Sequence, residues 1–313
     1  MIRKINPEFQ SGVHLLEQSY NLLQNTKTTK KGMDFLVKGL HAKRAEWEKS
    51  HWRFFCERIC LSHPIRHLVH QDPITFRSYS KPRGYSGDAV LMDFLYNHPS
   101  VREKVNRSTR IGQAIFDYHV TSPSAASVRW RREYLSQLID ETAHRVADPE
   151  ILSVACGHLR EAKFSAALQN DTVKRFIAFD QDPESLAIIE AERVSAKIEC
   201  IQGTVKDLIR RKHNFGTFDL IYSAGLYDYL SDKAARLLTK ILFGMLKKDG
   251  RLLIANFLPG TKECGYMEAF MGWKLLYRTK EHFERVVEPL SDYVQRIVFD
   301  DNRYVLYLEF RRR

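Results

Sequence analysis

The residues best suited to chemistry follow short apolar runs in the second half of the chain. The first run leads into Ala155-Cys156-Gly157-His158, and the second ends at Asp180-Gln181-Asp182. Asp180 follows Gly157 at about the 20-residue interval at which an acid accepts hydrogen bonds from ribose hydroxyls. A glycine after the first strand lets the backbone approach a ligand closely, because it has no Cβ. The pattern predicts a nucleotide-type cofactor held by Asp180, ahead of Asp182; the alternative is that both acids only serve a helix start.

Two further loops follow the next apolar runs. One is Gly203-Thr204-Val205, which we expect either along an adenine edge or as a plain helix start. The other is Ser223-Ala224-Gly225, whose small residues leave room for a ligand, followed by Tyr227 and Tyr229. Aromatic faces attract cationic groups, so these tyrosines are candidates to line a reaction chamber, although at least one is expected to be ordinary core. The cofactor-binding candidates are Ala155, Gly157, His158, Asp180, Gln181, Thr204, Val205, Ser223 and Gly225.

Strands that alternate with helices must position these loops. The expected strands are Ile151 to Val154, Val173 to Phe179, Ile198 to Ile201, Phe218 to Tyr222 and Arg251 to Ile254. Such alternation implies right-handed crossovers and a parallel sheet, whose carboxyl ends bring the loops to one edge. Two β-rich runs, Tyr293 to Phe299 and Tyr304 to Phe310, predict a closing hairpin, with Asn302 tolerant of turn geometry. The expected fold class is α/β, a Rossmann-like core with a C-terminal antiparallel hairpin and an N-terminal helical domain.

The first part of the chain has helical spacing and little strand character. We expect a helical domain over residues 1–145 and a cofactor-binding domain over 146–313. A long amphipathic helix is predicted from about Pro123 to His144, with Ser122 as its N-cap. The loop Gly84-Tyr85-Ser86-Gly87-Asp88 interrupts the helices. Its two glycines suggest that it presents the tyrosine ring as a lid over the cofactor; the alternative is a structural turn.

Composition restricts the function classes. The net charge of +11, from 49 basic and 38 acidic residues, is spread along the chain. Solvated basic faces explain it best, an anionic small substrate comes next, and nucleic acid is an unfavoured third. The five scattered cysteines form no C-x-x-C pair, so we expect a reducing compartment, no disulfide framework and no metal. No apolar run suits a membrane span or a secretory signal, so we expect a cytoplasmic protein with no membrane partner.

Five segments together resemble class I methyltransferase-like proteins, dependent on S-adenosylmethionine, of the extracellular factor 3-hydroxypalmitic acid methyl ester biosynthesis type. They occur in the family's order over about residues 80 to 280, and they are Pro82–Asp88, Val128–Arg132, Ser153–Ala162, Asp219–Leu230 and Asn256–Thr279. The resemblance implies a helical domain lying over a Rossmann-like methyltransferase core, with S-adenosylmethionine as cofactor. One departure is that Leu159 stands where the first cofactor loop usually has its second glycine.

The resemblance also implies transfer to a small molecule. We expect methyl transfer, with a carboxylate as a suitable acceptor, because an ionised carboxylate needs only alignment and exclusion of water. A protonated amine or a hydroxyl would need a base, and the catalytic candidates are Tyr85, Tyr227, Tyr229 and Tyr266. An arginine can hold a carboxylate, of the substrate or of the methionine moiety, through its bidentate fork. The substrate-binding candidates are Arg83, Arg129, Arg131, Arg132 and Asn256.

Three alternatives stay open. Attack on the aminobutyryl chain of the cofactor would give aminocarboxypropyl transfer or internal cyclisation and would release methylthioadenosine. A nucleic-acid methyltransferase would suit the charge, but the Asn/Asp-Pro-Pro-aromatic motif of amino-methylating enzymes is replaced by Ser223-Ala224-Gly225-Leu226 after the fourth strand. The third alternative is a non-catalytic module that binds the cofactor. The sequence leaves the acceptor and the oligomeric state open.

Overall fold

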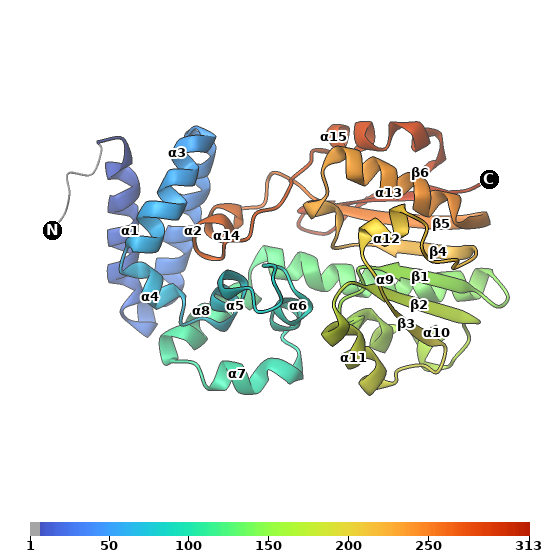
Figure 1. Ribbon diagram of the computed structural model, residues 1–313. Helices are drawn as coiled ribbons and strands as arrows, with labels where there is room; N and C mark the ends of the chain where they lie inside the picture. The colour runs from blue at the N-terminus through green and yellow to red at the C-terminus, as the bar shows by residue number, and fades with distance from the viewer. Residues whose placement is uncertain (1–6) are drawn as a thin grey trace. The chain divides into compact units, whose positions relative to one another are not determined.

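The computed structural model describes residues 7–313, which form two compact units (Figure 1). The helical unit contains the described residues up to 126 together with 261–274, and the sheet unit contains residues 127–260 and 275–313. The division differs from the expected boundary at residues 145 and 146. The long helix α9 (Pro123–Arg145) accounts for the difference, because most of its length packs on the sheet. The return of residues 261–274 to the helical unit was not expected.

The helical unit is built from amphipathic helices and short helical turns. Its helices are α1 (Gln10–Leu23), α2 (Thr29–Glu46), α3 (Lys49–Phe54), α4 (Ile65–Val69), α5 (Pro73–Ser80), α6 (Ala89–Leu95), α7 (Arg102–Asn106), α8 (Arg110–Val120) and α14 (Cys264–Phe270). The Glu268 carboxylate fixes α14 to this unit, because it accepts hydrogen bonds from Arg44 Nε at 2.8 Å and Trp52 Nε1 at 2.6 Å. Gly265 lies against the backbone of Leu40, where an added Cβ would come within 2.7 Å. Helix α14 is therefore an integral part of the helical unit.

The sheet unit holds seven strands in the order β3-β2-β1-β4-β5-β7-β6. The strands are β1 (Glu150–Val154), β2 (Arg175–Asp180), β3 (Ile198–Gln202), β4 (Phe218–Ser223), β5 (Leu246–Phe257), β6 (Val294–Phe299) and β7 (Val305–Arg311). The first five pair in parallel, and β7 pairs antiparallel with β5 and β6. This order confirms the predicted Rossmann-like fold with its C-terminal hairpin. In the hairpin turn, however, the positive φ falls on Arg303 (55°) and not on Asn302.

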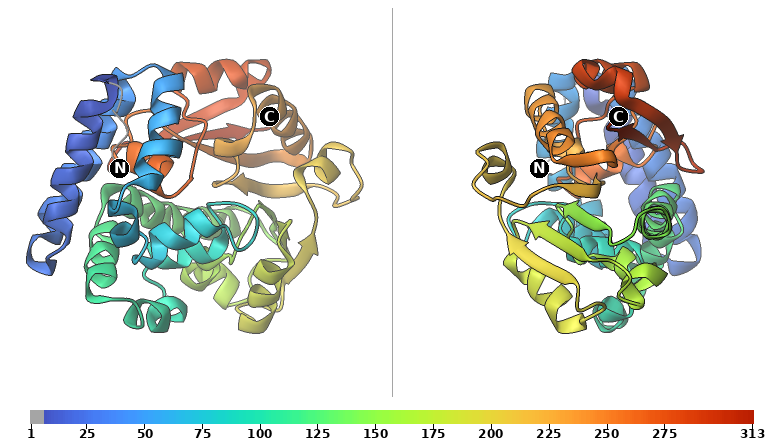
Figure 2. Two further views of the ribbon diagram at one scale, coloured as in Figure 1. Left: turned by 60° about the vertical axis from the view of Figure 1, so that its left-hand side comes forward. Right: turned by 90° about the vertical axis from the view of Figure 1, so that its right-hand side faces the viewer.

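Helices cover both faces of the sheet, and the alternation of side chains assigns each face. The remaining helices of this unit are α10 (Ala166–Gln169), α11 (Pro183–Glu192), α12 (Val205–Ile209), α13 (Asp232–Gly244) and α15 (Lys280–Val286). Leu252 and Leu308 belong to the core that includes residues of α13 and α15. Neighbouring positions face α9, as Arg251 bonds to Thr142 at 2.9 Å and Tyr307 packs on Trp130. Figure 2 (right) shows α9 in green and α13 in orange on opposite sides of the strands.

Helix α9 brings a charged side chain to the sheet. One row of its buried residues, at helical spacing, contains Val128, Arg131, Leu135, Leu138 and Thr142. Four of these five residues are apolar or small, as a stripe that faces a sheet requires. The guanidinium of Arg131 is therefore placed where a hydrophobic side chain would normally lie.

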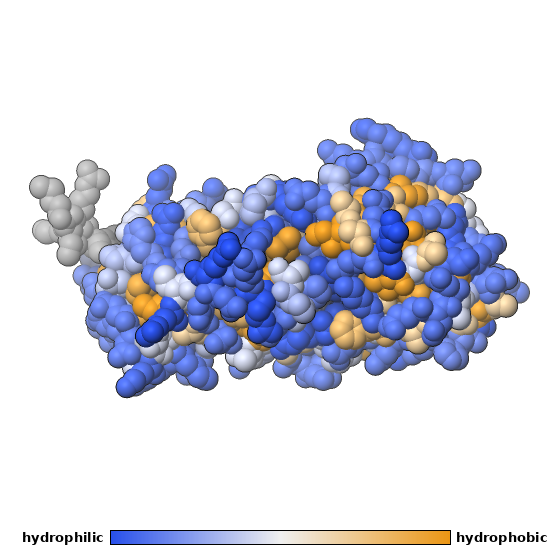
Figure 3. Space-filling model, turned by 90° about the horizontal axis from the view of Figure 1, so that it is seen from below, coloured by the Kyte–Doolittle hydropathy of each residue, from blue (hydrophilic) through white to orange (hydrophobic). Residues whose placement is uncertain are grey.

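The surface in Figure 3 is mostly hydrophilic. On the face shown in Figure 3, hydrophilic residues cover most of the area, and hydrophobic residues form scattered groups. None of the described helices is both long and apolar enough to cross a bilayer.

Candidate functional site

The loop after β1 has an unusual backbone. Ala155, Gly157 and Leu159 all have positive φ, at 56°, 54° and 48°. A non-glycine residue in this region costs roughly 1–2 kcal/mol, so the surrounding contacts must maintain the conformation. Ala155 N donates to the Phe179 carbonyl at 2.8 Å, and Leu159 N donates to the Cys156 carbonyl at 3.0 Å. Leu159 thus adopts the left-handed conformation that a second glycine would ordinarily provide, and its side chain is buried.

Asp180, at the end of β2, joins this loop to the second strand. One carboxylate oxygen accepts a hydrogen bond from Gly157 N at 2.8 Å, and the other accepts one from Asp182 N at 2.9 Å. Burial raises the pKa of the Asp180 carboxyl, and the backbone N–H donors partly oppose the rise. A carboxylate has about four lone-pair sites, so two N–H bonds leave acceptor capacity for hydroxyl groups. Asp180 is therefore both a support for the first loop and a group that can hold a ribose.

Asp182 has a different role. Its side chain accepts hydrogen bonds from Glu184 N at 3.1 Å and Ser185 Oγ at 2.7 Å, so it is the N-cap of α11. For Asp182 the helix-start interpretation is therefore correct. The neighbouring Gln181 is exposed.

The third loop lies directly beside Asp180. Gly203 N donates to the Asp180 carbonyl at 2.9 Å, and a Cβ on Gly203 would lie 2.5 Å from the Phe179 ring. Thr204 and Asp207 form a capping box at the start of α12, and Val205 is the first residue of that helix. The helix start that the sequence offered as an alternative is thus present, next to the acid that could hold the ribose.

At the end of β4, side chains join three elements. Ser223 Oγ donates to the Val154 carbonyl at 3.0 Å, which ties β4 to β1. Arg131 of α9 donates from one terminal nitrogen to the Ala224 carbonyl at 2.7 Å, and a Cβ on Gly225 would lie 3.5 Å from that nitrogen. The buried positive charge of Arg131 therefore lies at the carboxyl end of the sheet, where parallel α/β folds bind their ligands.

The other two arginines of this segment differ from Arg131. Residues two positions apart on a helix face different sides, so Arg129 and Arg131 have different surroundings. Arg129 is half-buried, and burial lowers the pKa of its guanidinium, with a further decrease from the nearby Arg132 charge. Arg132 lies over the Phe164 ring at 4.1 Å. Each arginine of the segment is therefore a separate candidate.

The two tyrosines after β4 have different environments in the structure. Tyr227 is fully buried, its hydroxyl hydrogen-bonds to Thr239 Oγ1 at 2.9 Å, and its ring packs edge-on against Phe283. In this structure Tyr227 is therefore part of the core, which was the expectation for at least one of the two tyrosines. Tyr229 is 41% exposed, so it can contact a ligand.

Asn256 also differs from its expected role. Its amide nitrogen donates to the Leu276 carbonyl at 3.0 Å and to the Phe257 carbonyl at 2.9 Å, and its oxygen accepts from Arg278 at 2.5 Å. The contacts of this buried amide are therefore structural in this conformation. Arg278 is itself buried and also donates to the Tyr227 carbonyl.

The helical unit contains the remaining candidates. Arg83 and Tyr85 are half-buried in the loop between α5 and α6, where Gly84 has a φ of 85°. Tyr266 of α14 is fully buried, and its hydroxyl hydrogen-bonds to Thr75 Oγ1 at 2.8 Å. Burial raises the pKa of the Tyr266 hydroxyl well above its ordinary value. Tyr266 therefore lies in the core of the helical unit.

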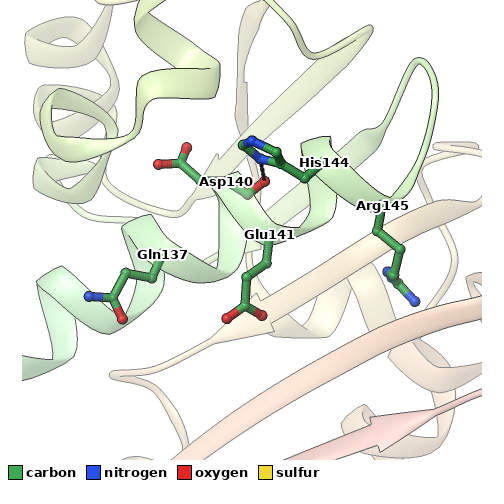
Figure 4. Close-up of a pocket in the computed structure, with 5 residues that line it drawn as sticks. All are labelled: Gln137, Asp140, Glu141, His144 and Arg145. Atoms are coloured by element: carbon green, nitrogen blue, oxygen red, sulfur yellow. Dashed lines mark hydrogen bonds between the residues drawn. The ribbon is translucent and has the colours of Figure 1, made fainter.

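A surface hollow of about 550 Å³ lies elsewhere on the sheet unit, along the second half of α9 (Figure 4). Its lining side chains already have partners: Asp140 caps the start of α10, Glu141 pairs with Arg251, and Arg145 bonds to the Asp249 carbonyl. These residues belong to the end of α9 that leads into the amino end of β1, opposite the loops described above. Among residues 7–313, no group of three or more His, Cys, Asp or Glu is arranged to hold a metal ion.

Sequence reasoning missed several buried charges in the sheet unit, among them Glu161 and Arg278. Glu161 is 6% exposed and accepts a hydrogen bond from the Tyr222 hydroxyl at 2.8 Å. Both residues lie within segments of the family resemblance, but nothing in their spacing marks them as buried. For Arg131 a signal did exist, because it interrupts the apolar stripe of α9.

Comparison with known proteins agrees with this geometry. Residues 152–254, which run from β1 to β5, match the family described as methyltransferase domain. No curated protein matches the chain in sequence. A solved structure of a "possible exported protein" from Bordetella parapertussis is 12% identical, covers 99% of both chains and has a TM-score of 0.58. At this identity the likeness establishes a shared fold, and it does so over almost the whole chain.

Two enzyme structures are also similar. The N-methyltransferase NodS from Bradyrhizobium japonicum, bound to S-adenosylhomocysteine, is 18% identical over 58% of this chain and 87% of its own, with a TM-score of 0.43. Magnesium protoporphyrin IX methyltransferase from Synechocystis, also bound to S-adenosylhomocysteine, is 10% identical over 72% of this chain and 100% of its own, with a TM-score of 0.47. The family match and the fold together show that the sheet unit contains a class I methyltransferase domain, an enzyme domain whose cofactor is S-adenosylmethionine.

Proposed function

We propose that this enzyme transfers the methyl group of S-adenosylmethionine to a carboxylate of a small molecule. One observation carries the proposal: the acid and the hydroxyl that directly follow the β4 loop, those of Asp228 and Tyr227, are buried and bonded to the protein itself. Asp228 accepts a hydrogen bond from Phe257 N at 2.7 Å, and Tyr227 is bonded to Thr239. Because both side chains are buried, neither is exposed to take a proton from an acceptor. A carboxylate acceptor fits such a site, because it is already ionised and needs no general base.

The residues at the strand ends fit the cofactor. The left-handed loop of Ala155 and Gly157 lets the backbone approach a ligand, and Asp180 retains lone pairs for ribose hydroxyls. Arg131 offers a buried positive charge to the carboxylate of the methionine end. The bound cofactor supplies an electrophilic methyl group on its sulfonium. The protein's own task is to align the acceptor and exclude water.

Arg129 is the residue we assign to the acceptor carboxylate. Arg131 bonds to the Ala224 carbonyl and Arg132 lies over the Phe164 ring, whereas Arg129 is half-buried on a different side of α9. Tyr229, exposed beyond the end of β4, is the tyrosine of this unit that can contact the acceptor. We also propose that Tyr85 and Arg83, in the loop between α5 and α6, take part in turnover.

The segment resemblance makes 3-hydroxypalmitic acid the first acceptor to test. The experiment incubates the enzyme with S-adenosylmethionine and this acid, and with a cell extract in parallel, and follows both products by mass spectrometry. The expected result is a methyl ester together with S-adenosylhomocysteine, with Asp180→Ala as the inactive control. Release of methylthioadenosine would contradict methyl transfer and would support attack on the aminobutyryl chain. A methylated product that is not an ester would refute the carboxylate assignment alone.

A further inference from the structure

A buried acid that has no assigned role lies beside the first cofactor loop. Glu161 belongs to the 3₁₀ turn Arg160–Phe164, directly after Leu159, and it is among the buried charged residues of the sheet unit. Carboxylates are seldom buried unless they are paired, because removing the charge from water is costly. The partners of Glu161 therefore indicate what this acid is for.

Those partners come from two different elements. The Tyr222 hydroxyl of β4 donates to Glu161 Oε1 at 2.8 Å, and this ring is almost completely buried. Burial raises the pKa of the Glu161 carboxyl, while the charges of Arg131 and Arg132 on α9 act in the opposite direction. The acid thus lies at the junction of the first loop, β4 and α9.

The two arginines are held in different ways. Arg132 lies over the Phe164 ring, at the far end of the same 3₁₀ turn. Arg131 donates to the Ala224 carbonyl at the end of β4. Arg131 is therefore anchored by the Ala224 carbonyl, two residues after Tyr222, whose hydroxyl donates to Glu161. A planar guanidinium anchored at one nitrogen, with a carboxylate held by the same strand, can present its donor fork in a preferred direction, which suits bidentate contact with a carboxylate.

We propose that Glu161 is a positioning residue whose carboxylate orients the Arg131 guanidinium toward the amino-acid end of the cofactor. The enzyme then distinguishes ligands that carry this end from nucleosides that lack it. A hydrophobic pair would satisfy packing at this place with less desolvation, so the charge is retained for orientation. This inference rests on the proposed function, because it takes the methionine carboxylate as the partner of Arg131.

The test compares two ligands by titration calorimetry. S-adenosylhomocysteine has the amino-acid end, and 5′-methylthioadenosine lacks its amino and carboxyl groups. Glu161→Gln is expected to weaken binding of S-adenosylhomocysteine about tenfold, the size of one hydrogen bond to a charged group, and to change methylthioadenosine binding less than about twofold. Tyr222→Phe, which removes only the hydroxyl that bonds to Glu161, is expected to give a smaller loss with the same selectivity.

Two controls separate positioning from general damage. Glu309→Gln removes another buried carboxylate from the sheet unit and is expected to leave both affinities unchanged. In an Arg131→Ala background, Glu161→Gln is expected to add no further loss, because the residue acts through Arg131. Equal losses for both ligands, no loss for either, or additive losses in the double variant would each overturn the inference. Failure of the unaltered enzyme to bind either ligand would instead overturn the proposed function.

Discussion

Asp180→Asn is the substitution that tests the cofactor site most directly. The change preserves shape but replaces one carboxylate oxygen with an NH₂ group, which donates and cannot accept. In the structure both oxygens accept backbone N–H groups, from Gly157 and from Asp182. Asparagine can satisfy only one of them. The other N–H loses its acceptor, at a cost of about 1–3 kcal/mol to the stability of the sheet unit.

The effect on binding adds to this structural cost. Hydrogen bonds from ribose hydroxyls to a charged acceptor are worth roughly 1.5–3 kcal/mol. Since about 1.4 kcal/mol is a factor of ten, the affinity for S-adenosylhomocysteine is expected to fall by about one to two powers of ten. Calorimetric titration of the folded variant measures this loss, and circular dichroism checks that the sheet is intact.

Asp182→Asn is the matched control for this measurement. Asparagine is as good an N-cap as aspartate, so α11 should keep its start and the affinity should stay within about twofold of the unaltered enzyme. If Asp182→Asn lost affinity and Asp180→Asn did not, the ribose would belong to the other acid. Undiminished affinity in both variants would mean that the cofactor does not lie at this strand end.

Asp180 also gives the binding a pH dependence. Burial raises the pKa of its carboxyl, so in the unligated enzyme the protonated form is favoured to a higher pH than in an exposed aspartate. The folded state then binds more protons than the unfolded state in that range, and its stability falls as the pH rises through the raised pKa. Ribose hydroxyls donate to the ionised form, so the affinity for the cofactor should fall as the pH is lowered through the same range. An Asp180→Asn variant should show a flatter affinity profile.

The remaining predictions concern other parts of the chain. Gly157→Val should abolish cofactor binding in calorimetry while circular dichroism stays that of a folded protein, because a β-branched residue resists the φ of 54°. Tyr85→Ala should reduce turnover more than Tyr85→Phe if the face of the ring is the working group, because a cation–π contact with a desolvated cation is worth about 2 kcal/mol. Equal losses in the two variants would point to the hydroxyl. Arg278→Ala should lower the unfolding free energy in denaturant titrations by about 1–3 kcal/mol for each buried oxygen left without its donor, of which the Tyr227 carbonyl and the Asn256 amide oxygen are two. Burial lowers the pKa of His119 to about 3. Its neutral ring therefore contributes stability that is present above about pH 6.5 and is lost as the pH falls toward 3. In His119→Gln the melting temperature should fall less between about pH 7 and pH 5 than in the unaltered protein.

The fold of the sheet unit was predictable because its strands are short, apolar and regularly separated. Each predicted strand has a counterpart, and the closing hairpin lies where the β-rich runs indicated. The division of the chain into two units was harder to predict from the sequence. Helical spacing identifies a helix but not which unit its apolar stripe covers, and α9 packs mainly on the sheet. Helix α14 reads as an ordinary helix after β5, while its packing partners lie more than two hundred residues earlier in the chain.

Within the site, backbone-determined residues were easier to predict than polar side chains. Gly157 and Asp180 occupy positions that the strand order fixes, so their spacing was informative. The sequence identifies the functional groups of Tyr227 and Asn256. Only the structure shows that these groups are hydrogen-bonded to Thr239 and Arg278. The burial of Glu161 was hidden for the same reason, because it depends on Tyr222 from another strand.

The position of α14 in the chain also sets the order in which the protein can be completed on the ribosome. Domains usually fold as they emerge, from the N-terminus onward. Here the helical unit needs residues 261–274, which are synthesised only after the first five strands of the other unit have been made. Until then the part of α2 around Leu40 has no α14 to pack on it. The helical unit therefore cannot complete its packing until residues 261–274 have been translated, after most of the sheet unit. We expect the two units to complete folding at about the same stage of synthesis.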